Sequence, residues 1–368
     1  MGGREEQPDE SGTRPTYRPK HVRPLRRRRR IVGIIAGSLA GILVIAAAFV
    51  VYQYNDISNG IHRSAITLPK SSATAKGPGQ LAATNILLMG LDSRLDENGN
   101  PLPAAVYNAL HAGDGSDGGY NTNVLMLIHI PGGGKPAVGI SIPRDDYVNI
   151  PGSPDDVSTT KIKEAYGLEL DQTLRHLVNT TNLPHAAAYQ QARAAARQEE
   201  ISTVSQFLGG VPINHFIEVT MAAFYQIAEA VQPITVCVKE ATSDPYSGAK
   251  FTAGYQQLDA SQAVAFVRQR RDLNNPALNF TDLDRERRQQ AFIVSLAYKL
   301  KQSGTLTNIG TLNTLIGVAK QNIALDSGFD LLSFIQQARG LAGGNISFTT
   351  LPITGYATIE SGSIPCVK

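Results

Sequence analysis

The segment Asn85–Arg94, which reads NILLMGLDSR, decides the fold class. Its first part, Asn85–Leu91, is a short apolar run, and such a run bounded by turn residues is typical of a buried strand. The polar residues Asp92, Ser93 and Arg94 follow at its carboxyl end. Ligands of α/β sheets usually bind outside the carboxyl ends of strands. The segment therefore predicts an α/β fold with a candidate site beside Asp92.

Apolar runs and helical patterns alternate through the rest of the chain, which predicts a sheet covered by helices on both faces. The turn Gly132–Gly134 predicts a hairpin between the second and third strands. Residues 92–120 are expected to form a long loop, and loops of that length in a compact domain are often functional. The other expected strands are 124–130, 137–142, 215–219, 234–238 and 346–351, and the expected helices are 161–208, 221–230, 259–270, 282–302 and 307–342, the last broken near Asp326.

An uncharged apolar stretch at residues 31–52 is long enough to span a bilayer as a helix. The basic run Arg26–Arg30 precedes it, and basic residues stay on the cytoplasmic side of a membrane. A cleavable signal peptide is the alternative, but the stretch ends without the small residues of a cleavage site. We therefore expect a single-pass protein of the cell membrane: a basic cytoplasmic tail at 1–30, a transmembrane helix at 31–52, a linker at 53–82 and one extracytoplasmic domain at 83–368.

The formal net charge of +3 comes from the tail, where residues 1–30 hold ten Lys and Arg against four Asp and Glu. This basic run abuts the membrane span without interleaved aromatic residues, which favours contact with anionic lipid and argues against nucleic acid as a partner. The two cysteines, Cys237 and Cys366, match no metal-ligand spacing. They form one disulfide in an oxidising compartment or remain unpaired thiols, and the sequence leaves both possibilities open.

The sequence has no GxSxG, P-loop, HExxH or CxxC motif, so it indicates no covalent nucleophile or closed metal site. Arginines gather instead beside the predicted strand ends and helix termini. Such clustering suits a multiply charged phosphate ligand, which Arg binds through bidentate forks. Asp92 and Asp282 are then candidates to hold a divalent cation, because Mg²⁺ bridges carboxylates to phosphate oxygens. The arginines are Arg94, Arg144, Arg268, Arg270, Arg285 and Arg288.

Five stretches between about residues 84 and 293 resemble the LytR-CpsA-Psr family of cell-envelope phosphotransferases, and they follow in the family's order. They are NILLMGLDSR, LMLIHI…AVGISIPRDDYVNIPG, KIKEAYG, GGVPINHFIEV and LDASQAVAFVRQRR…DLDRERRQQ. The resemblance implies a three-layer α/β/α domain with a central mixed sheet and a hydrophobic pocket for a polyprenyl-pyrophosphate-linked glycan. It further implies transfer of the phosphoglycan to peptidoglycan, with Mg²⁺ or Mn²⁺ as cofactor.

The resemblance also implies roles for individual residues. Asp92 and Asp282 match the acidic positions associated with the metal ion. Arg144, Arg268, Arg270, Arg285 and Arg288 match pyrophosphate-facing or structural arginines, and Lys161, Tyr166 and Gln289 match further pocket positions. We predict a catalytic set of Asp92, Arg144, Arg268, Arg270, Asp282 and Arg285. The predicted pyrophosphate-binding or pocket set is Arg94, Lys161, Tyr166, Arg288, Gln289, Asn121 and Asn123.

One departure from the family pattern concerns the entry to the second strand. The family usually shows Arg-x-Asp there, whereas this chain has Asn121-Thr122-Asn123. Neutral amides thus replace a guanidinium and a carboxylate, which bears on metal affinity more than on the fold. Arg94, from the neighbouring loop, is our hypothesis for the source of the missing positive charge.

Two other classes of function compete with the transferase. A membrane regulator would bind polyprenyl pyrophosphates without turnover, and a pyrophosphatase would use water as the acceptor. Within a transferase, the acceptor hydroxyl would lose its proton to Asp92 or Asp145, and Asp145 is equally suited to a structural role in its turn. The apolar pocket would be lined by Met221, Phe224, Ile227 and Ala228 or by Ala263, Phe266 and Val267, although ordinary core packing explains most of these residues.

Overall fold

The computed structural model describes residues 55–56, 60–70, 83–113, 119–131, 135–278, 280–301, 308–330, 334, 346–353 and 355. The predicted tail, the predicted membrane helix, the Gly132–Gly134 turn and Cys366 lie outside these residues. Among the described helices, none is both long and apolar enough to cross a bilayer. The chain divides between residues 55 and 56, and the unit that starts at Asp56 contains every element discussed below.

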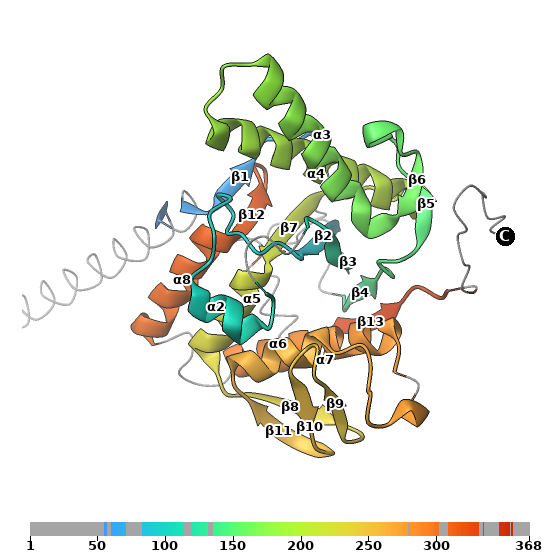
Figure 1. The fold of residues 1–368 in the computed structure, drawn as a ribbon, viewed down its shortest axis with the longest axis vertical. Coiled ribbons are helices and arrows are strands. Elements are labelled where there is room, and N and C mark those ends of the chain that lie inside the picture. The colour runs from blue at the N-terminus through green and yellow to red at the C-terminus, as the bar shows by residue number, and fades with distance from the viewer. Residues whose placement is uncertain are drawn as a thin grey trace, which may run out of the picture. The chain divides into compact units, whose positions relative to one another are not determined.

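A seven-stranded mixed sheet forms the centre of this unit, as the alternating pattern predicts (Figure 1). Strands β2, β3 and β4 are antiparallel neighbours, which confirms the predicted hairpin between the second and third strands. Strand β2 also pairs in parallel with β7, and β4 pairs in parallel with β13. The order across the sheet is β1 (His62–Ser64), β12 (Ile323–Asp326), β7 (His215–Thr220), β2 (Thr84–Leu91), β3 (Thr122–Ile130), β4 (Ala137–Ser141) and β13 (Ile346–Thr350).

Helices pack on both faces of the sheet because successive side chains of a strand point to opposite faces. Leu87 of β2 belongs to one apolar cluster with Val204 of α4 (His185–Phe207), which packs side by side with α3 (Ala165–Thr180). Ile86, the preceding residue, belongs to a second cluster that Ala319 of α8 (Ile309–Asn322) joins. The central strands are therefore buried on both sides.

A smaller layer of helices and hairpins forms a second core. Helix α6 (Ala260–Arg268) begins with a capping box, in which the Asp259 side chain accepts from the Gln262 amide and Gln262 reaches back to the Asp259 amide. The cluster includes Phe266 of α6 and Phe292 of α7 (Asp282–Lys301). Its other elements are α5 (Met221–Val231), which packs beside α8, and the strands β8 (Ile234–Val238), β9 (Thr242–Asp244), β10 (Ala249–Phe251) and β11 (Gly254–Leu258).

Four local predictions differ from the structure. The helix expected at 161–208 is two helices, and the one expected at 307–342 gives way after Asn322 to strand β12, because Ala324 and Leu325 pair with β7 and are buried. Residues expected to belong to the linker form β1, which pairs with β12. The long loop contains the short helix α2 (Ala104–Leu110). The short strands β5 (Tyr147–Asn149) and β6 (Thr159–Lys161) form a further hairpin.

Candidate active site

Three strand ends bring the predicted polar residues to one edge of the sheet. Because β3 runs antiparallel to both β2 and β4, its start lies beside the ends of the other two strands. Asp92 follows β2, and its backbone amide donates to the carbonyl of Asn121 at 2.9 Å. Asn123 lies at the start of β3, and Arg144 follows β4. The topology thus places these four residues at one edge of the sheet, where ligands of α/β sheets usually bind.

A compact ion cluster connects this edge to the start of α7. The guanidinium of Arg144 forms a bidentate fork with the carboxylate of Asp282, with Nε to Oδ2 at 3.2 Å and Nη2 to Oδ1 at 3.1 Å. Arg285, one turn further along α7, donates from Nη2 to Oδ2 of Asp282 at 2.9 Å. Arg144 also donates from Nη1 to Oδ1 of Asn123 at 2.5 Å. A neutral amide therefore accepts here the hydrogen bond that a carboxylate would otherwise accept.

A second group of arginines extends the cluster toward the end of α6. Arg268 donates from Nη1 to the carbonyls of Leu110 and His111, so that the end of α2 holds its side chain. Burial, together with the guanidinium groups of Arg94 and Arg270, lowers the pKa of Arg268, although the Asp92 carboxylate opposes this. Asp92, Arg94, Arg268 and Arg270 are therefore electrostatic neighbours.

Arg270 also links the two groups of arginines. Burial and the charges of Arg144 and Arg270 lower the pKa of Arg285 to about 10, although Asp282 acts in the opposite direction. Like charges that disfavour one another in this way store repulsion that a bound anion would relieve. The five arginines of the cluster outnumber the aspartates Asp92 and Asp282 among them, although the Asp145 carboxylate also lies 3.7 Å from Arg144 Nε. The geometry therefore describes an anion site of high local charge.

Four residues of the predicted binding set have other contacts. Arg288 is buried, with its guanidinium Cζ 4.8 Å from the ring centroids of both Phe266 and Phe280, and it donates from Nη1 to Gln269 Oε1 at 2.6 Å. These contacts are those of a structural arginine. The other three residues also contact the protein. Gln289 donates to the carbonyl of Val267 at 3.4 Å, and Lys161 lies 3.7 Å from the Asp145 carboxylate. Tyr166 is fully buried and accepts from Arg193 Nε at 2.7 Å.

The residues implied to hold a metal ion fit it only in part. Both carboxylate oxygens of Asp282 already accept from arginines, and Asn123 carries no charge. In the part of the chain that the structure describes, no hydrogen bond or ion pair engages the Asp92 carboxylate, and no group of three or more His, Cys, Asp or Glu residues could hold a metal ion. Of the two aspartates that the family pattern associates with the metal ion, only Asp92 has a carboxylate that no described residue engages, and the described residues form no protein-made metal cage.

A buried charge network beside the site was not found from the sequence. Arg193 and Arg197 of α4 form ion pairs with Glu97, from the loop after β2, and with Glu218 of β7, and all four side chains are at most 1% exposed. Arg193 also donates to the hydroxyl of Tyr189, which lies 3.0 Å from the hydroxyl of Tyr120. The network therefore holds both ends of the loop that carries Asp92, Arg94 and Asn121. The spacing of Arg193 and Arg197 by four residues was its only local signal.

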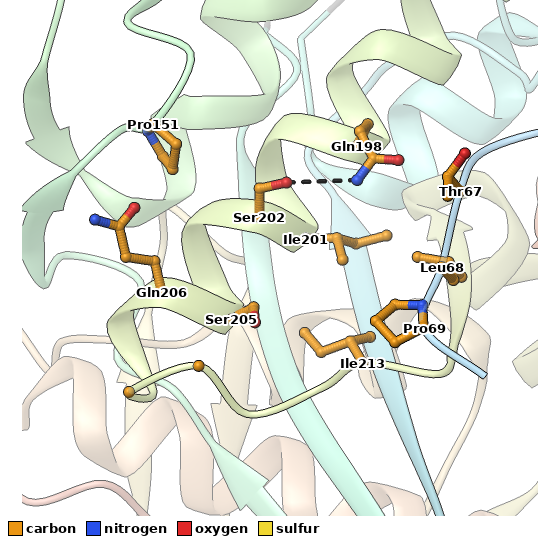
Figure 2. A pocket seen from close by; sticks show the side chains of 12 residues that line it. Thr67, Leu68, Pro69, Pro151, Gln198, Ile201, Ser202, Ser205, Gln206 and Ile213 are labelled. Atoms are coloured by element: carbon orange, nitrogen blue, oxygen red, sulfur yellow. Dashed lines mark hydrogen bonds between the residues drawn. The ribbon is translucent and has the colours of Figure 1, made fainter. Parts of the chain in front are cut away.

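Two cavities lie beside α3 and α4. One of about 600 Å³ is lined by Leu68, Pro69, Ile201 and Ile213 among others, and on its α4 wall Gln198 donates a hydrogen bond to Ser202 one turn further along the helix (Figure 2). It lies at the start of β7, opposite the edge that carries Asp92. The other, of about 510 Å³, reaches the site through Tyr120 and Asn121.

Neither cavity is lined by the apolar residues proposed from α5 or α6. Ala263, Phe266 and Val267 are buried in the second core, and Ala228 joins them there. The core-packing interpretation is confirmed for these four residues.

Comparison with known proteins gives the family. The model of the LytR_cpsA_psr family matches residues 49–364. The chain is 34% identical over 317 residues to the cell wall biosynthesis protein LcpA of Corynebacterium glutamicum, covering 86% of this chain and 59% of that protein. It is 23% identical over 343 residues to the polyisoprenyl-teichoic acid–peptidoglycan teichoic acid transferase TagT of Bacillus subtilis, covering 90% and 87%.

A solved structure titled TagT bound to LI-WTA superimposes with a TM-score of 0.50 at 19% identity, covering 82% of this chain and 91% of that one. This likeness shows the fold alone. The match to the family model extends over most of the chain and includes every residue of the candidate site. The chain therefore belongs to the LytR-CpsA-Psr family.

Proposed function

We propose that this protein is a transferase that moves a phosphoglycan from a polyprenyl-pyrophosphate lipid onto peptidoglycan. The observation that carries the proposal is the arginine cluster, in which mutual repulsion and burial lower the pKa of Arg268 and Arg285. A pyrophosphate diester carries two negative charges, and arginine forks bind phosphate oxygens in pairs. The names of TagT and TagU relatives, which act between a polyisoprenyl-linked teichoic acid and peptidoglycan, support the same class of substrate.

The reaction follows from what these side chains can do. An acceptor hydroxyl oxygen attacks the phosphorus that carries the glycan, and the bond from that phosphorus to the bridging oxygen breaks. Polyprenyl phosphate leaves with the bridging oxygen and its negative charge. Arg144, Arg268 and Arg285 would stabilise that charge, because phosphoryl transfer depends mainly on positioning and charge neutralisation.

The proton of the acceptor hydroxyl must pass to a base. Burial raises the pKa of Asp145, but the hydrogen bond from Lys163 at 2.6 Å and the charge of Arg144 outweigh it and hold the pKa below its usual range. Asp145 is therefore a poor proton acceptor and a good structural anchor for its turn. Of the two candidates, Asp92 is the one whose carboxylate remains available, and we assign the role to it.

Divalent cation dependence is part of the proposal. Mg²⁺ commonly binds through one or two carboxylates together with substrate phosphates. Asp92 fits that mode, whereas Asp282 would first have to release its arginines. The ion, Mg²⁺ or Mn²⁺, would supply additional charge neutralisation at the phosphate oxygens.

We further propose that residues 31–52 anchor the protein in the cell membrane, with the catalytic domain outside the cytoplasm.

A polyprenyl-pyrophosphate-binding regulator is the second candidate. The neutral Asn121 and Asn123, which stand where the family usually has a charged pair, favour it because they remove one guanidinium and one carboxylate from the site. A pyrophosphatase would use the same site with water as the acceptor, so its products alone distinguish it from a transferase.

The test is an assay of the full-length chain in detergent with a glycan-bearing polyprenyl pyrophosphate and Mg²⁺, with and without peptidoglycan fragments. Products are identified by mass spectrometry, and Asp92→Ala and Arg268→Ala serve as site variants. We expect polyprenyl phosphate and a glycan-linked acceptor from the unmodified chain and neither product from the variants. Free phosphoglycan in place of the linked acceptor would establish the pyrophosphatase, and tight binding without any cleavage would establish the regulator.

A further inference from the structure

An exposed tyrosine is held rigidly on the turn between β9 and β10. Tyr246 is 64% exposed, although aromatic side chains are usually buried. Its backbone amide donates to Oδ1 of Asp244 at 3.0 Å, and the hydroxyl of Ser247 donates to Oδ2 of the same carboxylate at 3.0 Å. Asp244 itself is only 1% exposed. The buried carboxylate thus fixes the turn that presents the ring.

The guanidinium of Arg271 fixes the ring itself. Its Cζ lies 4.2 Å from the centroid of the Tyr246 ring, and its Nε lies 3.9 Å from Oδ1 of Asp244. A stacked cation of this kind lowers the freedom of an aromatic side chain and leaves its other face open. Tyr246 and Arg271 therefore form a preorganised aromatic platform with one exposed face.

The platform lies at the border of the anion site. The charge of Asp244 acts on Arg268, a member of the arginine cluster. Gly248, with φ of +75°, closes the same turn so tightly against His111 that an added Cβ would lie 2.8 Å from the imidazole. The carbonyl of His111 in turn accepts from Arg268 at 3.4 Å. The turn that carries Tyr246 is thus in contact with the segment that holds a phosphate-facing arginine.

We propose that Tyr246 and Arg271 form a subsite for a sugar ring of the glycan on the lipid donor. The inference rests on the proposed function and extends it to the carbohydrate part of the substrate. The first sugar of such a donor is bonded directly to the phosphate, so it must lie next to the arginines that bind that phosphate. A pyranose presents an apolar face of C–H groups that packs on an aromatic ring, and tyrosine makes such contacts at low cost in side-chain entropy. The guanidinium of Arg271 adds donors for the sugar hydroxyls.

The test compares the binding of two lipids to the full-length chain in detergent: polyprenyl pyrophosphate with a glycan and the same lipid without one. The variants are Tyr246→Ala, Tyr246→Phe and, as a matched control, Tyr255→Ala on β11, where the tyrosine is 83% exposed. We expect Tyr246→Ala to bind the glycan-bearing lipid about tenfold more weakly, which is the order of a lost aromatic stacking contact. Its affinity for the bare lipid should be unchanged, and Tyr246→Phe and Tyr255→Ala should bind both lipids normally.

Equal affinity of Tyr246→Ala and the unmodified chain for the glycan-bearing lipid would overturn the subsite. If that variant then showed a raised KM for peptidoglycan fragments in the transfer assay, the platform would serve the acceptor. Failure of the unmodified chain to bind either lipid would contradict the proposed function and the subsite with it, and the control lipid separates that case from loss of the sugar contact alone.

Discussion

At the residue scale, Asn123 shows how a neutral side chain can tune a charged site. Its amide oxygen accepts from Arg144 at 2.5 Å, so it orients the guanidinium as a carboxylate would. Unlike a carboxylate, it leaves the positive charge of Arg144 largely available to a ligand. Asp282 is therefore the carboxylate that joins Arg144 to Arg285, while Asp145 lies 3.7 Å from Arg144 Nε on the neighbouring turn.

The residue that we expect to replace the missing family arginine is Arg94. Its Nε donates to the carbonyl of Ala112, and its charge acts on Arg268 within the cluster. Arg94→Ala should weaken the binding of a polyprenyl pyrophosphate about ten- to hundredfold, because a hydrogen bond to a charged group contributes about 1.5–3 kcal/mol. Calorimetric titration measures the change, with Arg175→Ala, an exposed arginine of α3, as the control. An unchanged affinity would remove Arg94 from the site.

A second residue, Glu200 of α4, makes stability depend on pH. Burial raises its pKa from 4.5 to about 8, although hydrogen bonds from the Thr122 side chain and from the backbone amide of Tyr166, the latter at 3.0 Å, act in the opposite direction. Between these two pH values the folded chain binds more protons than the unfolded chain. The stability from this group is therefore fully present below about pH 4.5 and is lost as the pH rises toward 8.

Glu200→Gln should abolish that loss, since glutamine does not titrate. The variant should become more stable than the parent as the pH rises from about 5 to about 9, with the difference appearing in urea unfolding curves across that range. As a control, Glu229→Gln, at an exposed position of α5, should differ from the parent in stability by the same amount at every pH in that range. A parent and a Glu200→Gln variant with parallel pH profiles would contradict the assignment.

At the scale of elements, α4 fastens the loop of the site to the sheet. Arg193 and Arg197 both pair with Glu97 and Glu218, so removal of Arg193 leaves one buried guanidinium to balance two buried carboxylates. Arg193→Met should lower the free energy of unfolding by about 3–5 kcal/mol, as expected when one member of a buried ion pair is lost. Urea denaturation measures it.

The matched control for this prediction is a double variant. Replacing Glu97 by Gln together with Arg193→Met removes a charge of each sign. The double variant should therefore lose less free energy of unfolding than the sum of the losses in the two single variants. Strict additivity would show that the two residues do not interact in solution.

The same elements show what a sequence can and cannot predict. Strand ends and the capping box of α6 follow from local patterns, so the edge that carries Asp92 and Arg144 was predictable. The sequence predicts helix where strand β12 forms, because a run as short as Ile323–Asp326 has no decisive periodicity. The inward orientation of Arg193 was equally hidden, since its partners Glu97 and Glu218 are distant in sequence. Contacts of that range depend on the assembled fold.

At the scale of the whole molecule, the folded unit begins at Asp56, shortly after the expected membrane helix in the sequence. A chain that begins at Asp56 keeps every element from β1 onward. We expect the full-length chain to sediment with membranes and the shorter chain to remain in the supernatant after high-speed centrifugation, because residues 31–52 would supply the bilayer span. A full-length chain found in the supernatant would contradict the anchor.

A chain that begins at residue 83, the domain start expected from the sequence, should behave differently because it lacks β1. Arg63 of β1 donates from Nη1 to the carbonyls of Asp326 at 3.1 Å and Phe329 at 2.7 Å, and the neighbouring Ile61 is 5% exposed. Loss of these contacts would expose β12 as an unprotected sheet edge, which favours aggregation. The chain from residue 83 should therefore unfold at lower temperature than the chain from residue 56 and form larger species by light scattering. Equal melting temperatures and monodisperse samples of both chains would show that β1 is dispensable and that the linker extends to residue 82.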